Sequence, residues 1–227
     1  MNQNLFPNLL HELSHSPNLC LHVAATPGAG KNEFLTEILS ALFDPSHPMT
    51  EILYYCDTHA NYPTRLWNKW NQNVRKATIA TLANLKHKLE LIIQDDRFQN
   101  TFFLIDSISD LFQKSLSTDF REYQTLVKEF GSQIIPLLLE AQLNQQIHFI
   151  LIHHFAYKPS LDCQFPVQKP LMDLLPGIWV YLRKMPCSSA DYNAWSYSIQ
   201  IIGDSTFSWV PFDAYYSLTP HFMITQN

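Results

Sequence analysis

The stretch CLHVAATPGAGKNEF, residues 20 to 34, decides the fold expected for this chain. It opens with an apolar run that is typical of a buried strand, and the residues that follow it begin an amphipathic helical pattern. A short loop with Gly28 and Gly30 joins the two. A strand, a glycine-bearing loop and a helix in this order form a repeating unit of α/β proteins with a parallel sheet.

The loop matches most of a phosphate-binding loop, whose pattern is GxxxxGK[ST]. In that pattern the glycines let backbone amides surround phosphates, the lysine reaches the outer phosphates and the hydroxyl binds Mg²⁺. Here Ala25 replaces the first glycine and Asn32 replaces the hydroxyl. An ordinary turn between a strand and a helix is the alternative. The sequence leaves binding of ATP and Mg²⁺ open, and the predicted binding residues are Thr26, Pro27, Gly28, Ala29, Gly30, Lys31 and Asn32.

A further candidate site residue ends the most apolar strand in the sequence. The run TFFLID, residues 101 to 106, is nearly all apolar, as is typical of a strand covered on both faces. Ligands of α/β sheets bind at the carboxyl edge of the strands, so Asp106 is predicted to approach a Mg²⁺ ion held by the loop. A cap or turn residue after the strand is the alternative.

Strand-like and helical segments alternate along most of the chain, which predicts an α/β fold: a mostly parallel sheet flanked by helices. Gly131 and Pro136 interrupt the last helical pattern and predict two helices or one kinked helix. The runs 178–184 and 195–202 indicate antiparallel strands at a C-terminal sheet edge, after a loop over 156–176. The other predicted strands are 19–25, 51–56, 101–106 and 148–155, and the predicted helices are 33–43, 82–93 and 120–146.

Length and composition bound the class of protein. A chain of 227 residues with 46% hydrophobic content can bury one core of ordinary size. No run approaches the roughly 20 apolar residues of a membrane span, and the N-terminus does not read as a secretory signal. The four cysteines form no CxxC pair, which favours reduced thiols in the cytosol or nucleus, and the ten histidines show no zinc spacing. We therefore expect no structural metal.

Charge is distributed unevenly. The segment 65–89 holds six basic residues and no acidic one, which leaves nine basic and 20 acidic residues, a net charge of −11, in the remainder. Trp67 and Trp70 lie among these cations, a combination that can stack bases and neutralise phosphates. A solvated helix face with two core tryptophans is the alternative. Because the rest of the chain is acidic, single-stranded DNA would bind here only with the help of a partner subunit.

Three strings resemble the RecA-type recombinases of the eukaryotic and archaeal branch: ILYYCDTHANYPTRL (52–66), FLIDSISDLF (103–112) and FILIHHF (149–155). The resemblance covers about residues 19–184 and implies a RecA-like P-loop core. Since the first predicted strand begins near residue 20, residues 1–227 are interpreted as a single RecA-like ATPase-type domain without an N-terminal DNA-binding domain. In size and layout the chain is most similar to the small ATPase-like subunit of Shu-type complexes, a recombinase paralogue.

This resemblance implies a nuclear recombination mediator that binds recombinase-pathway subunits and assists recombinase assembly on single-stranded DNA in DNA repair. The sequence departs from the family at its catalytic glutamate, whose position is His59, and at its phosphate-sensing pair, matched by His153 and His154. These departures argue against hydrolysis, so we assign no catalytic residue and expect a degenerate P-loop ATPase at most. An active P-loop ATPase is the first alternative. A small-molecule nucleotide kinase ranks last, because the five arginines form no cluster in the sequence.

Overall fold

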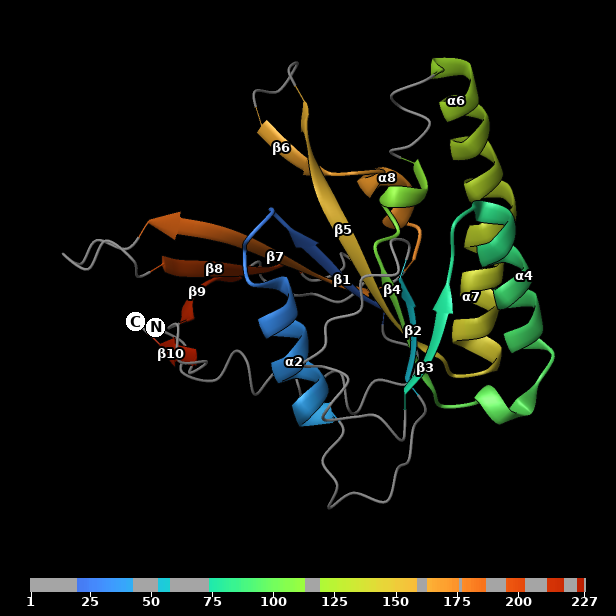
Figure 1. Ribbon diagram of the computed structural model, residues 1–227, viewed down its shortest axis with the longest axis horizontal. Helices are drawn as coiled ribbons and strands as arrows, with labels where there is room; N and C mark the ends of the chain where they lie inside the picture. The colour runs from blue at the N-terminus through green and yellow to red at the C-terminus, as the bar shows by residue number, and fades with distance from the viewer. Residues whose placement is uncertain are drawn as a thin grey trace.

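The computed structural model of the chain describes residues 20–42, 53–57, 74–112, 119–158, 163–175, 177–186, 195–202, 212–218 and 224–226. Within these ranges ten strands form a sheet in the order β10-β9-β8-β7-β1-β5-β4-β2-β3, with β6 paired to β5 (Figure 1). The strands are β1 (Cys20–Ala25), β2 (Leu53–Asp57), β3 (Val74–Thr78), β4 (Phe102–Asp106), β5 (His148–Lys158), β6 (Cys163–Pro166), β7 (Gly177–Pro186), β8 (Trp195–Ile202), β9 (Phe212–Leu218) and β10 (Ile224–Gln226).

The central strands run parallel. Strand β1 pairs in parallel with both β5 and β7, and β4 pairs in parallel with β5 and β2. Strands β8, β9 and β10 continue the sheet in antiparallel pairing. The predicted α/β class, a mostly parallel sheet with antiparallel strands at the C-terminus, is confirmed.

Helices cover both faces of this sheet (Figure 1). They are α2 (Lys31–Leu42), α4 (Leu82–Ile93), η1 (Asp96–Phe98), α6 (Phe120–Glu129), the π-helical turn η2 (Phe130–Ile134), α7 (Ile135–Asn144) and the short α8 (Lys169–Met172). Alternation along β1 assigns the faces, because successive side chains of a strand point to opposite sides. Cys20 and Ala24 belong to the cluster that includes α4 and α7 residues.

In the described segments, no helix is both long and apolar enough to cross a membrane.

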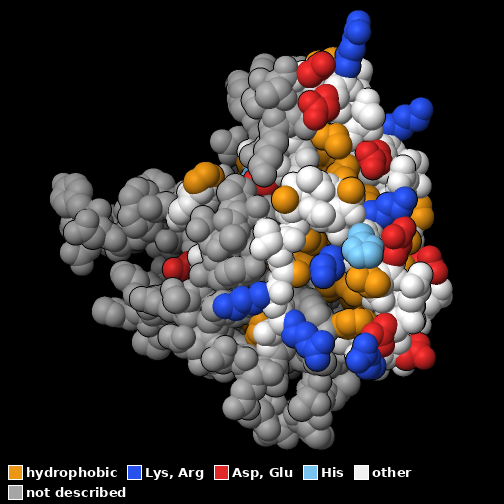
Figure 2. Space-filling view, turned by 45° about the vertical axis from the view of Figure 1, so that its right-hand side comes forward, with side chains coloured by type: hydrophobic (Ala, Val, Ile, Leu, Met, Phe, Trp, Pro, Cys, Tyr) orange, Lys and Arg blue, Asp and Glu red, His pale blue; other side chains and the backbone are white. Residues whose placement is uncertain are grey.

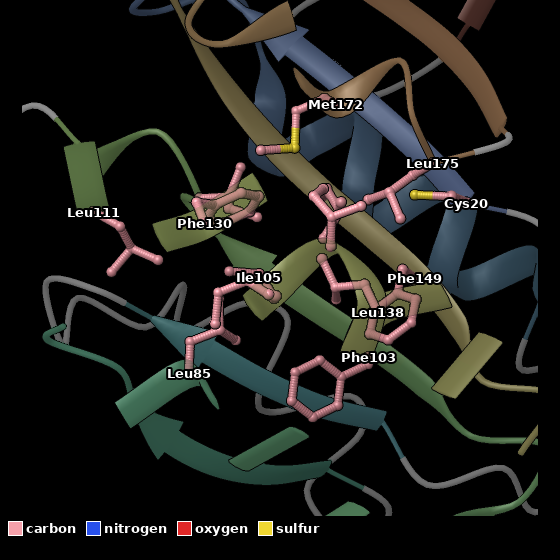
Figure 3. Packing of buried hydrophobic residues seen from close by; sticks show 14 of the residues in the cluster. Cys20, Leu85, Phe103, Ile105, Leu111, Phe130, Leu138, Phe149, Met172 and Leu175 are labelled. Carbon is pink, nitrogen blue, oxygen red and sulfur yellow. The ribbon is translucent and has the colours of Figure 1, made fainter. Parts of the chain in front are cut away.

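The large apolar cluster lies between the sheet and the α4, η2 and α7 layer (Figure 3). Phe103 of β4 and Phe149 of β5 meet edge to face, with ring centroids 5.8 Å apart and planes at 71°. Leu85 of α4 and Leu138 of α7 are fully buried in the same cluster. This packing fixes β4, which ends at Asp106, and β5, whose parallel pairing with β1 ends at His154.

Several expectations for individual elements are confirmed, and others are wrong. Helix α4 has the predicted bounds, and the pattern over 120–146 gives α6 and α7 joined through η2. The run 178–184 is not at an edge, because β7 lies between β1 and β8. The segment 156–176, predicted as a loop, contains the end of β5, β6 and α8, while β3 at the far edge was not predicted.

Candidate functional site

The loop after β1 makes a tight turn at the carboxyl edge of the sheet. The Ala29 amide donates to the Thr26 carbonyl at 3.0 Å, and the Thr26 amide donates to the Leu182 carbonyl of β7 at 3.2 Å. Gly28 and Gly30 have φ angles of +73° and +75°, in the left-handed region that favours glycine. Pro27 and Gly28 are exposed at the tip of the turn, whereas Ala29 is buried. The loop therefore turns at Gly28 and at Gly30, of which Gly30 occupies a glycine position of the pattern.

Helix α2 begins directly after this turn. The first hydrogen bond of the helix runs from the Phe34 amide to the Gly30 carbonyl, at 2.9 Å. The amides of residues 31–33 thus precede the first intrahelical bond, as at every helix N-terminus. Such amides, together with the helix dipole, attract anions. Asn32 is exposed in this first turn, and its carbonyl accepts a hydrogen bond from the Thr36 hydroxyl at 2.7 Å.

The ammonium group of Lys31 contacts both carboxylate oxygens of Asp106, at 2.7 and 2.8 Å. The two side chains are 24% and 11% exposed, so this ion pair lies at the floor of the site rather than on the open surface. Asp106 at the end of β4 thus lies beside the lysine of the loop, and its predicted approach to Mg²⁺ stays a prediction. In the structure, the Lys31 ammonium occupies the Asp106 carboxylate that was expected to approach Mg²⁺.

A polar network follows Asp106 on the same turn. The Ser107 hydroxyl donates to Asp110 Oδ2 at 2.8 Å, and the His154 amide donates to the Ser109 hydroxyl oxygen at 3.0 Å. Asp110 Oδ1 lies 3.5 Å from His154 Nε2. Sequence reasoning missed Asp110, although an acid four residues after Asp106 was a readable signal. The network joins the turn after β4 to His154 of β5.

The two consecutive histidines of β5, His153 and His154, have different surroundings. His154 is one-third exposed and faces Asp110, while His153 is fully buried. His153 Nε2 lies 3.1 Å from Nδ1 of His22, and both rings contact the Trp179 ring. The expectation of a phosphate-sensing pair is thus corrected for His153, because strand alternation turns its side chain into the core. His59 lies outside the described residues.

Burial sets the pKa values of this histidine pair. The pKa of His22 is lowered to about 3, chiefly by the loss of hydration on burial; a hydrogen bond with the Leu175 backbone acts in the opposite direction, and the positive charge of Lys169 adds a smaller lowering effect. Burial also holds the pKa of His153 well below its usual value, with smaller contributions from His22, His154 and Lys169. Lys169 of α8 sits above the Trp179 ring, 4.6 Å from its centroid. Both histidines are therefore neutral in the folded protein near neutral pH.

The basic segment 65–89 is described only from residue 74 onward. Lys86 and Lys88 lie on α4, and Lys86 contacts Gln133 at 2.9 Å and Glu90 at 3.9 Å. Arg75 and Lys76 are exposed on β3. Figure 2 shows the face over α4 with basic and acidic side chains interspersed. This described part resembles a solvated surface. Trp67 and Trp70 lie outside the described residues.

The residues of the loop fit a nucleotide phosphate better than they fit Mg²⁺. The glycine turn and the start of α2 present amides, the donors that phosphates need. For Mg²⁺, Asn32 offers no hydroxyl, and both oxygens of Asp106 are engaged by Lys31. Among the described residues, no three His, Cys, Asp or Glu side chains gather to hold a metal ion. The donor set thus departs from a magnesium-nucleotide site.

Comparison with known proteins identifies the fold. A crystal structure of the RadB recombinase superposes with a TM-score of 0.61, over 90% of this chain and 89% of that chain, at 15% sequence identity. No protein-family model matches the chain, and no curated protein sequence matches it. The chain therefore has a RecA-like fold.

Proposed function

We propose that this chain is a recombination-mediator subunit, a recombinase paralogue that binds partner subunits and assists recombinase assembly on single-stranded DNA during homologous-recombination repair in the nucleus. The observation that carries this proposal is the fold, shared over 90% of the chain with a recombinase. The resemblance of the strings around Asp57, Asp106 and His153 to eukaryotic and archaeal recombinases supports the same class. Within this class, we assign the chain by its size and layout to the small ATPase-like subunits of Shu-type complexes.

The site supports binding rather than turnover. A RecA-type ATPase needs a base for water and a group that senses the terminal phosphate. The glutamate position of the family is His59 here, and one of the two sensing positions, His153, is buried against His22 and Trp179. Lys31 and the loop remain suited to phosphate. The chain would then act through its partners, with nucleotide held at its loop.

Single-stranded DNA would be contacted through residues 65–89 and only within a complex. Three of the basic residues of this segment are exposed on β3 and α4, namely Arg75, Lys76 and Lys88, and Lys86 of α4 is partly exposed. Acidic side chains stand among basic ones on the same face (Figure 2), which limits its attraction for phosphates. A partner that contributes further cations would complete the DNA-binding surface.

Native purification from cells tests the proposal. The full chain with an affinity tag should bring down subunits of the recombinase pathway at levels well above a tagged, unrelated protein of the same size. Enrichment should survive nuclease treatment, because the contact is between proteins. A soluble, folded bait that enriches no recombination protein would contradict the proposed function.

An active P-loop ATPase is the second candidate, and one observation favours it: Lys31 and Asp106, the two groups such an enzyme uses on phosphate and metal, meet at the loop. It predicts measurable ATP turnover that is lost in Lys31→Ala.

A further inference from the structure

The ion pair between Lys31 and Asp106 bears on which nucleotide the loop accepts. In a working P-loop site the lysine reaches the outer phosphates and the acid acts on the metal side. Here the ammonium is held by both oxygens of the carboxylate, at 2.7 and 2.8 Å. The positive charge nearest the loop is thus already paired within the protein.

We propose that the loop takes a nucleoside diphosphate without Mg²⁺ and discriminates against the triphosphate. This inference rests on the proposed nucleotide site and names its ligand class. The terminal phosphate of a diphosphate can be held by the amides at Gly30 and the start of α2, with Lys31 remaining on Asp106. Its binding requires no rearrangement of the ion pair.

A triphosphate meets a cost in either arrangement of Lys31. If the lysine stays on Asp106, the additional phosphate brings further negative charge near the Asp106 carboxylate. The ammonium of Lys31 would then have to neutralise both the carboxylate and the phosphate. If the lysine moves to the phosphate, Asp106 loses its bidentate partner at a side-chain exposure of only 11%. Separating a largely buried carboxylate from its cation is unfavourable, because little water is present to replace the lost contact.

A bound Mg²⁺ ion would offset this cost by neutralising negative charge at the site. The P-loop hydroxyl that would bind the metal is replaced by Asn32, which is exposed in the first turn of α2. To reach Asp106, the metal would also have to displace the ammonium of Lys31 from both oxygens. The loop therefore offers few ligands for Mg²⁺, so we expect the preference for the diphosphate over the triphosphate to hold when Mg²⁺ is present.

Titration calorimetry of the full chain with ADP and with ATP, each in EDTA and in excess Mg²⁺, tests the inference. We expect ADP to bind at least about tenfold more tightly than ATP in EDTA, and Mg²⁺ to leave that order unchanged. Asp106→Asn removes the carboxylate charge, so it should raise the affinity for ATP and reduce the difference between the affinities for ADP and ATP. Asp95→Asn is the matched control, since Asp95 also binds a cation, Arg97, through both oxygens but precedes the amino end of β4.

The outcomes separate this inference from the proposed function. Tighter binding of magnesium-ATP than of ADP by the wild-type chain would overturn the diphosphate preference and leave the recombination role standing. If neither nucleotide bound in any condition, the diphosphate preference would also be overturned. The recombination role would still be tested by the native purification. Because the wild-type titrations alone decide, an unfolded Asp106→Asn variant would not weaken the test.

Discussion

Gly177→Ala is expected to destabilise the protein by at least about 4 kcal/mol, enough to remove most of the soluble, folded chain. A Cβ atom at this position would lie 2.0 Å from the Cys20 carbonyl oxygen and 2.8 Å from its carbonyl carbon. Gly177 and Cys20 are register partners of β7 and β1, so the collision is with backbone that cannot move without opening the ladder. The measurement is urea denaturation followed by circular dichroism, together with soluble yield.

The close pairing of β7 with β1 also affects the phosphate loop, which follows β1 at its carboxyl end. The Leu182 carbonyl of β7 accepts the Thr26 amide, so the separation of β7 and β1 also positions the loop. Gly131→Ala is the matched control, because its Cβ would meet only the flexible end of Leu171, at 3.1 Å, within a helical turn. That variant should shift the unfolding free energy by no more than about 1 kcal/mol. Equal midpoints for Gly177→Ala and wild type would contradict the assigned register.

Acidification is expected to destabilise the fold through His22 and His153. Their pKa values are lowered in the folded protein from the ordinary histidine value of 6.5, to about 3 for His22 and well below that ordinary value for His153. The unfolded chain therefore binds more protons over the window between these values. The contribution of each histidine to stability is fully present above about pH 6.5 and is lost as pH falls, by up to about 1.4 kcal/mol per pH unit.

Denaturant midpoints measured between about pH 4 and 8 check this expectation. Protonation of carboxylates also lowers the stability of the folded protein on acidification. The effect of the histidine pair is therefore isolated by comparing wild type with His22→Gln, because the glutamine side chain does not titrate. The slope below about pH 6.5 should be shallower in His22→Gln. The exposed His87 on α4 provides the control, and His87→Gln should keep the wild-type slope. An unchanged slope in His22→Gln would mean that the histidine pair is not buried as the structure has it.

The parts of the fold that the sequence predicts well are those in which periodicity and burial coincide. Helix α4 was predicted with its true bounds because Leu82, Leu85, Leu89 and Ile92 recur at helical spacing and are the residues the helix buries. Strand β4 was predicted because all five of its residues are buried. Strand β3 was missed because VRKAT, at the sheet edge, leaves most of its side chains exposed or half exposed and carries two cations.

The site was predictable in its parts but not in its pairing. The glycine loop and Asp106 follow from the motif and from the rule that parallel sheets bind ligands at their carboxyl edge. The bidentate contact of Lys31 with Asp106 depends on side-chain geometry across 75 positions of the chain. The burial of His153 depends on which face of β5 it occupies, and two consecutive histidines at a strand end do not reveal that. β7 was placed at an edge because its parallel partner, β1, is more than 150 positions away in the sequence.

We propose that this chain, which has a RecA-like fold, keeps its phosphate loop for binding and acts through partners rather than by hydrolysing ATP. ATP turnover by purified wild type and Lys31→Ala, measured with Mg²⁺ and with and without single-stranded DNA, tests it most directly. We expect both proteins to release phosphate at the rate of a protein-free blank. Turnover by the wild type that is abolished in a folded Lys31→Ala variant would contradict it.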